Sequence, residues 1–190
     1  MRLAQLDHTT LTGDDRALYQ DMKSGIEKSF KGFVAIDANA DLVGPWNPWL
    51  SFPKFGKPVW ELVKALADAP TLPGPVREIA ILVTGAVLRA DYELYAHIHV
   101  AEIKGLADDQ IRAIVCGQRP TNLTREQGLA YDFASALAQG GEVPELVYRQ
   151  ASATFGQDGA AEFIYLVGLY AMVCVTLSGF KVPVPTSDYA

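Results

Sequence analysis

The chain has 190 residues, a formal net charge of −6 and an apolar content of 49%. This length and composition predict one domain, residues 1–190, that buries a core without disulfides or a structural metal. The acidic balance argues against nucleic-acid binding, which requires clustered Lys and Arg, and the sequence contains no basic stripe with interleaved aromatic residues.

The two cysteines, Cys116 and Cys174, each stand alone in an apolar, helical context. This pattern predicts buried free thiols in a reducing compartment rather than a disulfide framework. The first ten residues contain Asp7 and no apolar run, so we expect no signal peptide and a cytoplasmic protein.

Apolar spacing and capping residues predict an all-α protein with about seven to eight helices, because no strand pattern of useful length occurs. In the first helix, Leu18, Met22 and Ile26 follow one another at i, i+4 spacing. The expected helices cover residues 14–30, 54–69, 75–89, 92–104, 108–116, 125–139, 144–155 and 159–177.

A long stretch, residues 31–53, is expected to be irregular because prolines and a glycine surround Trp46 and Trp49. Such a sequence is not typical of a helix interior. Loops of this length are uncommon in compact domains unless they have a function, so we expect this one to contribute to a site.

Residues 163–180 form a run of 18 residues without a charge, close to the shortest length that spans a membrane. Glu162 precedes the run directly and Lys181 is the only cation that follows it, so the flanks are not those of a typical span. We interpret the run as a helix buried on nearly all sides, without a membrane. Burying a helix all round in so small a protein usually takes a second subunit, so a homo-oligomer is expected.

Glu93 and His97 are the leading candidates for chemistry. Their i, i+4 spacing places both on one helical face, and the small Ala90 one turn earlier leaves room for a ligand. A carboxylate beside an imidazole fixes the tautomer and raises the pKa of the imidazole, as expected of a general acid or base. The alternative is an ordinary surface pair. His99 lies about 200° around the helix from His97, and His8 is expected to be exposed in an N-terminal arm, so no metal site is expected.

Glu78 lies at the start of the apolar central helix, where the helix dipole favours a carboxylate. It is therefore either a second acid–base group or a structural residue. Arg77 precedes it, and Arg89 is expected on the same face about three turns later. Either arginine can hold an anionic substrate group by a bidentate contact, or be the structural partner of a carboxylate.

Several segments occur in one order along residues 15–185. They are Gly44-Pro45-Trp46-Asn47, Arg77-Glu78-Ile79-Ala80-Ile81-Leu82, Tyr92-Glu93-Leu94-Tyr95-Ala96-His97, Ala101, Gly105-Leu106, Tyr131-Asp132, Phe155-Gly156 and the run from Glu162 to Tyr170. Together they resemble the carboxymuconolactone decarboxylase family, which shares its fold with the alkylhydroperoxidase AhpD. The resemblance implies an AhpD-like helical bundle that assembles into trimers or hexamers, with an N-terminal helical extension over about residues 1–50.

In the peroxidase branch of that family, a Glu on the central helix precedes a Cys-x-x-Cys-x-x-x-His motif. Matching that Glu to Glu78 and that His to His97 places the two cysteine positions at Ala90 and Glu93. Peroxide reduction requires one thiolate to attack and a second thiol to resolve. Because neither cysteine of this chain lies at those positions, the resemblance disfavours a peroxidase.

The resemblance therefore favours the decarboxylase branch: a lyase or isomerase that acts on a small unsaturated carboxylate or lactone by acid–base catalysis. No cofactor is expected, because the unsaturated carbonyl of the substrate delocalises the charge left behind by CO2. In this reaction His97 would deliver the proton, Glu93 would orient it and Glu78 would assist. Arg89 and Arg77 would hold the substrate carboxylate.

Trp46, Asn47 and Trp49 are expected either to wall the substrate pocket or to fill a seam between subunits, where Trp is enriched. Two other functions stay open: a hydroperoxide reductase with unorthodox cysteines, and a non-catalytic oligomeric protein that binds a ligand. Several helices build a pocket together, so the sequence does not identify the substrate.

Overall fold

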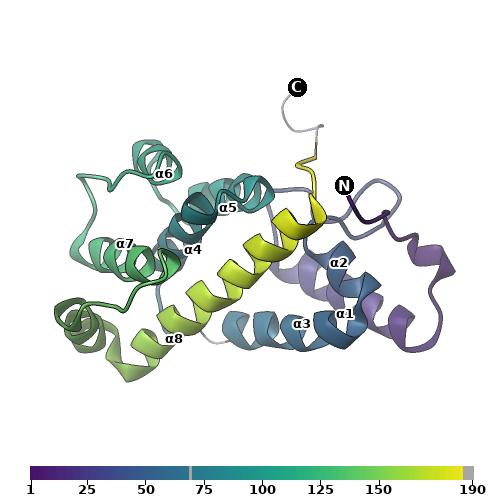
Figure 1. The fold of residues 1–190 in the computed structure, drawn as a ribbon, viewed down its shortest axis with the longest axis horizontal. Coiled ribbons are helices and arrows are strands. Elements are labelled where there is room, and N and C mark those ends of the chain that lie inside the picture. Colours follow the sequence, from purple (N-terminus) through teal and green to yellow (C-terminus); the bar gives the residue numbers. More distant parts are fainter. Residues whose placement is uncertain (69, 186–190) are drawn as a thin grey trace.

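The structure is a computed structural model that describes residues 1–68 and 70–185. Within these ranges it is all-helical, as expected, with a short 3-10 turn η1 (His8–Thr10), one isolated bridge between Ile36 and Leu42, and no β-strand. The helices are α1 (Gly13–Ser29), α2 (Trp46–Ser51), α3 (Pro53–Ala67), α4 (Gly74–Leu88), α5 (Asp91–Ile103), α6 (Asp108–Val115), α7 (Arg125–Ala138) and α8 (Glu145–Phe180) (Figure 1). Ala69, the last residue expected in the second helix, and residues 186–190 of the expected domain lie outside the described ranges.

The expectation of an irregular stretch over residues 31–53 is wrong at its end, where α2 forms. This helix begins at Trp46 and has Pro48 in its first turn. A proline costs little there, because the N–H that it lacks would have no partner inside the helix. Pro45 and Pro48 were expected to exclude a helix, but they lie at the cap and in the first turn of α2.

The element α8 consists of two helices, as expected, which meet at a kink at Gly156. Gly156 has φ 74° and ψ 177°, whereas the residues around it are helical. Glycine adopts a positive φ at little cost, so the chain changes direction there between the two helices. The charge-free run lies after this kink.

Two apolar cores meet along α8. Figure 1 shows α4 to α7 on one side of this helix and α1 to α3 on the other. The first core is built by α4, α6, α7 and part of α8, and the second by α1, α2, α3, the start of α5 and the C-terminal part of α8. Tyr170 on α8 packs against both cores. The junction between the cores therefore lies beside Tyr170.

The N-terminal arm is fixed to the rest of the protein. The N–H of Leu6 donates a hydrogen bond to Oδ1 of Asn47 at 3.0 Å. Nδ1 of His8 lies 2.8 Å from Oδ1 of Asp41, and its ring stacks on Tyr19 with centroids 5.0 Å apart. His8 is consequently half-buried, which corrects the expectation that it is exposed.

Cys174 is buried, as expected, but Cys116 is exposed. Because α6 ends at Val115, Cys116 is the cap residue and no longer follows the apolar face of the helix. The prediction of two buried thiols is therefore wrong for Cys116.

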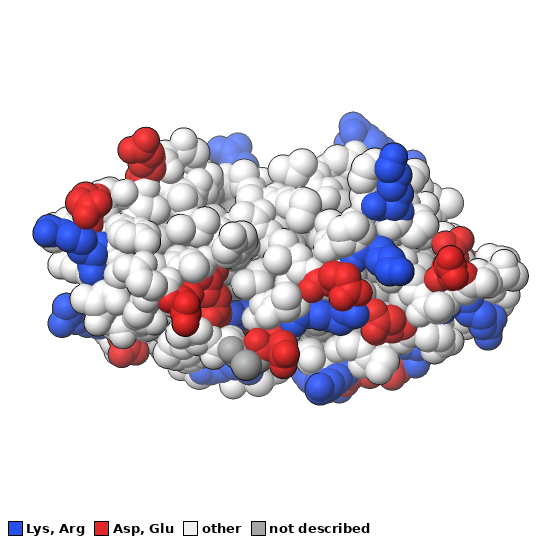
Figure 2. Space-filling model, turned by 90° about the horizontal axis from the view of Figure 1, so that it is seen from below, with Lys and Arg blue, Asp and Glu red and all other residues white. Residues whose placement is uncertain are grey.

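The surface mixes charged and apolar areas. Figure 2 shows Lys and Arg interspersed with Asp and Glu on one face, beside a broad uncharged area. α8 is long and apolar enough to span a membrane by length and composition alone. Its inner face contributes to both cores, whereas Ile164, Tyr165, Met172 and Val175 on the other side are exposed.

Candidate active site

The central feature of the site is His97, which lies between two carboxylates on neighbouring helices. Nδ1 of His97 is 2.7 Å from Oε2 of Glu78 on α4, and Nε2 is 3.1 Å from Oε1 of Glu93 on α5. The side chains of His97, Glu78 and Glu93 are 8%, 8% and 4% exposed. We call these three residues the triad. The predicted pair of Glu93 and His97 is thus in place, and its alternative, an exposed surface pair, is excluded by burial.

The turn between α4 and α5 brings the triad together. α4 ends at Leu88, and Arg89 closes it in the left-handed conformation, with φ 53°. α5 then folds back along α4. A side chain at Gly85 would lie 3.1 Å from Leu94 and 3.6 Å from the Cγ of Glu93, so glycine permits the close approach of the two helices.

The two contacts of His97 differ in kind. The contact with Glu78 is a hydrogen bond at normal length. Oε1 of Glu93 is completely enclosed but has no aligned hydrogen-bond donor among the described residues, so its contact with Nε2 is an ion pair. We therefore regard Glu78 as the residue that orients the ring and Glu93 as the more loosely held partner.

The charge of the two carboxylates determines the protonation of His97. Burial alone would lower the pKa of the imidazole, but the charges of Glu78 and Glu93, with the hydrogen bond to Glu78, outweigh burial and raise that pKa from 6.5 to about 10. His97 is accordingly an imidazolium at neutral pH.

Two hollows meet at His97. The first, which we call the aromatic hollow, has a volume of about 30 Å³, room for little more than a water molecule. The second, the lysine-rimmed hollow, has a volume of about 470 Å³. Both are lined by Phe30, Val63, His97, Leu169 and Tyr170.

Each glutamate faces a different hollow. Glu93 lines the aromatic hollow and Glu78 lines the lysine-rimmed hollow. The second oxygen of each, Oε2 of Glu93 and Oε1 of Glu78, accepts no hydrogen bond from a described residue. A carboxylate oxygen therefore remains for a ligand on each side of the imidazole ring.

Tyr170 is a site residue that the sequence did not identify. Its ring stands edge-on to His97, with centroids 5.0 Å apart, and it lines both hollows. Its hydroxyl forms no hydrogen bond with a residue that the structure describes. Burial, with the charges of Glu93 and Glu78, raises the pKa of this hydroxyl well above 10, so it stays protonated and can donate a hydrogen bond. The sequence signal that could have identified Tyr170 was a polar hydroxyl in an apolar helical run without charges.

The two tryptophans and Asn47 have different positions. Trp46 and Trp49 line the aromatic hollow, as expected of pocket walls. Asn47 instead faces the N-terminal arm, where it accepts from Leu6 and donates to the carbonyl of Ala4. Asn47 is not among the residues that line either hollow at His97, so it is a structural residue.

The two arginines also differ from expectation. Arg77 lines the lysine-rimmed hollow, but its guanidinium forms an ion pair with Glu162, which also accepts the N–H groups of Thr71 and Leu72. Arg89 is exposed and lines a separate hollow near Lys181. Arg89 therefore does not lie at the triad, and Arg77 is first a structural partner of Glu162.

Two other groups bear on possible chemistry. Burial raises the pKa of the Cys174 thiol, and the charge of Glu93 adds to this effect, so the thiol is a poor nucleophile. Within the described ranges, metal-ligand atoms cluster at Asp7, His8 and Asp41, in the N-terminal arm. Oδ1 of Asp41 already accepts from the backbone and lies against the ring of His8.

The arrangement of the site supports proton transfer. It combines a buried imidazolium, two carboxylates with a free oxygen each, and a neutral hydroxyl donor. These are the groups that move a proton to or from carbon and stabilise the oxyanion that forms. Comparisons with known protein families, with curated proteins and with solved structures gave no significant match to this chain.

Proposed function

We propose that this protein is an acid–base enzyme, similar to the carboxymuconolactone decarboxylase family, that acts on a small unsaturated carboxylate or lactone. The observation that supports this proposal is the position of His97 between two carboxylates, at 2.7 and 3.1 Å, where two hollows meet. Buried charged groups require compensating partners, and perturbed ionisable groups cluster at functional sites.

The proposed reaction uses a carboxylate–imidazolium relay. In a decarboxylation, the bond between the carboxylate carbon and the substrate breaks, CO2 leaves, and the electron pair moves onto the conjugated carbonyl as an enolate. Glu78 accepts the Nδ1 proton of His97 and delivers it to the carbon, and His97 regains a proton from water. In an isomerisation, Glu78 accepts a proton from one carbon and returns it to another. The hydroxyl of Tyr170 donates to the enolate oxygen in both cases.

Glu78 is the residue that touches the substrate in this proposal, because both nitrogens of His97 already face carboxylates. The aromatic hollow has room for little more than a water molecule, so the substrate occupies the lysine-rimmed hollow. Trp46 and Trp49 then close the far side of the triad against water. This assignment replaces the expected role of His97 as the direct proton donor.

The proposal includes a cytoplasmic homo-oligomer, a trimer or hexamer with an AhpD-like bundle in each subunit. In the most apolar 18-residue window of α8, 39% is buried within one chain. Ile164, Tyr165, Met172 and Val175 form an exposed apolar area on this helix. A second copy of the chain that packs on this area would remove it from water. Exposed apolar patches of this kind mark interfaces between proteins.

Of the other candidate functions, a ligand-binding role without catalysis is favoured by one observation. The two imidazole nitrogens of His97 have protein partners, as they would in a purely structural cluster. A thiol peroxidase is disfavoured, because Cys174 is buried with a raised pKa and Cys116 is exposed in another part of the fold. Turnover of a substrate would distinguish the acid–base enzyme from the non-catalytic binding protein.

The proposal is tested by incubating the protein with a panel of carboxylated, unsaturated lactones. Release of CO2 and incorporation of solvent deuterium at carbon are followed by NMR. We expect turnover that falls about 10²- to 10⁴-fold in Glu78→Gln and in His97→Gln. His99→Gln, on the same helix but outside both hollows, should retain full activity. A ligand that binds without conversion would establish the binding role, and full activity of Glu78→Gln would refute the mechanism.

A further inference from the structure

We infer that the lysine-rimmed hollow binds an extended amphipathic anion, with its carboxylate held by Lys28 and Lys104 at the mouth and its apolar body reaching Tyr170 and Glu78 at the base. This inference rests on the proposed function for the reacting end of the ligand. It adds the class of ligand, its orientation and two residues that bind it.

The hollow has room for a ligand larger than a simple lactone ring. Its volume of about 470 Å³ is within the range of pockets that enclose drug-sized molecules. Aliphatic side chains of α3, α4, α5 and α8 form part of its walls, beside the polar and charged groups. They include Val63, Leu66, Ile81, Val100, Leu166 and Leu169. Such walls bind an apolar body by removing it from water.

The charges around the hollow are distributed unevenly. Lys28, Arg77 and Lys104 all line it, whereas Glu78 is the acidic residue among its described lining residues. Arg77 is already paired with Glu162, but neither Lys28 nor Lys104 forms an ion pair with a described residue. Two cations therefore remain to bind an anion.

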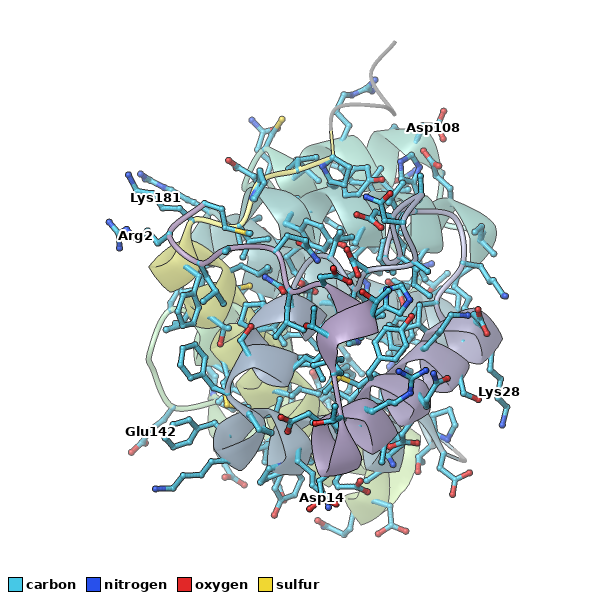
Figure 3. All side chains as sticks on the ribbon, turned by 90° about the vertical axis from the view of Figure 1, so that its right-hand side faces the viewer. Arg2, Asp14, Lys28, Asp108, Glu142 and Lys181 are labelled. Carbon is cyan, nitrogen blue, oxygen red and sulfur yellow. The ribbon has the colours of Figure 1, made fainter. Side chains whose placement is uncertain are left out.

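The two lysines lie at the mouth. Both are exposed, and Figure 3 shows Lys28 projecting outward at the end of α1. Lys104 caps α5, and its stem lies across Gly74, where a side chain would come within 3.1 Å of the Cδ of Lys104. The absence of a side chain at Gly74 thus gives the Lys104 stem its place along the edge of the hollow.

The charge of the triad determines the orientation of the ligand. The triad has two carboxyl groups for one imidazole, so a ligand carboxylate is placed less favourably against it than against two lysines. With the carboxylate at Lys28 and Lys104, the opposite, uncharged end of the ligand reaches Glu78 and Tyr170, an arrangement that fits the isomerisation and not the decarboxylation. The carboxylate that anchors the substrate is therefore distinct from the group that reacts.

The test compares two ligands of one shape and different charge. Binding of 6-phenylhexanoate and of its neutral amide is measured by calorimetry at low salt, so the readout does not require turnover. We expect the acid to bind about tenfold more tightly than the amide, and its affinity to fall as salt is added. Acetate, which has the charge without the body, should bind much more weakly.

Variants then locate the anion. Lys28→Met with Lys104→Met should weaken binding of the acid about tenfold and leave the amide unchanged. Lys57→Met is the matched control, since Lys57 is an exposed lysine outside this hollow. Leu66→Trp, which fills the hollow, should weaken both ligands. Each lysine also lies at a helix C-terminus, where a cation is stabilising, so unfolding by urea is measured for each variant.

Three results would overturn the inference: equal affinity for acid and amide, unchanged affinity of the double lysine variant for the acid, or no binding of the acid at millimolar concentration. His97→Gln separates this inference from the proposed function. Charge-dependent binding that persists in His97→Gln, in a protein without turnover on any lactone, would support the anion site and refute the enzyme. Turnover without charge-dependent binding would support the enzyme and refute the anion site.

Discussion

Nδ1 of His97 and Oε2 of Glu78 are 2.7 Å apart, although the two residues are 19 positions apart and lie on different helices. This contact is shorter and better aligned than the one between His97 and Glu93 within α5. The central pair of the site thus depends on how α4 and α5 fold onto each other, and not on helical spacing alone.

The raised pKa of His97 predicts that stability falls as pH rises. The folded-state pKa, about 10, is above the model value of 6.5, so the folded protein holds a proton that the unfolded chain loses. This contribution is fully present below pH 6.5 and is lost between pH 6.5 and pH 10. We expect a loss on the order of a few kcal/mol.

Urea unfolding at pH 6, 8 and 10 measures this loss, with His99→Gln as the control because His99 is half-exposed. His97→Gln should remove the pH dependence over this window. A wild-type protein as stable at pH 10 as at pH 6 would contradict the assignment of an imidazolium.

The two glutamates should differ in how far they raise this pKa. Glu78→Gln removes the nearer charge and a hydrogen-bond acceptor, and Glu93→Gln removes only a partner in an ion pair. We expect the pH at which stability declines to move lower in both variants, and further in Glu78→Gln. A larger shift in Glu93→Gln would show that the two contacts have been assigned in the wrong order.

Some of this site could be predicted from the sequence. Any two residues at i, i+4 spacing in a helix share a face. The pairing of Glu93 with His97 could therefore be predicted from local geometry alone. The contact with Glu78 was not predictable, because it depends on the turn between the helices. Arg89 was expected on the face of Glu78, about three turns later, but it lies in the left-handed conformation at the end of α4, where that periodicity no longer holds.

The fold shows the same division between local and tertiary information. The all-helical class and most helix positions followed from apolar spacing. The short helix α2 did not, because its prolines fall in the first turns of helices, where their missing N–H groups do no harm. The role of Asn47 depends on the N-terminal arm, which contacts it from about 40 residues away.

Tyr170→Phe should separate catalysis from folding. The hydroxyl has no hydrogen-bond partner among the described residues, so we expect the free energy of unfolding to change by less than about 0.5 kcal/mol. Turnover should fall about 10²-fold, because the enolate loses a donor. Tyr165→Phe, an exposed tyrosine on the same helix, is the matched control for urea unfolding and kinetics. Unchanged turnover of Tyr170→Phe would remove Tyr170 from the mechanism.

Arg77→Met should destabilise the protein by about 3–5 kcal/mol, because it leaves Glu162 largely buried without its ion-pair partner. Adding Glu162→Gln should recover part of this loss, although the amide replaces an acceptor of the N–H groups of Thr71 and Leu72. Urea unfolding of the two single variants and the double variant measures the coupling. Additive effects would show that the ion pair contributes nothing.

Val175→Glu should reduce the oligomeric state, because it places a charge in the exposed apolar area of α8. Phe55→Glu is the control, since Phe55 is similarly exposed but lies on α3. Light scattering coupled to gel filtration gives the mass of each variant. A wild-type monomer at micromolar concentration would contradict the proposed assembly.

The protonation of His97 in the wild-type protein tests the account most directly. Nitrogen-15 NMR of histidine-labelled protein, without ligand, reports whether each ring nitrogen carries a proton. We predict that both nitrogens of His97 are protonated at pH 8, and that the ring titrates near pH 10. A neutral ring at pH 8, with one nitrogen unprotonated, would contradict the carboxylate–imidazolium relay on which the proposed chemistry depends.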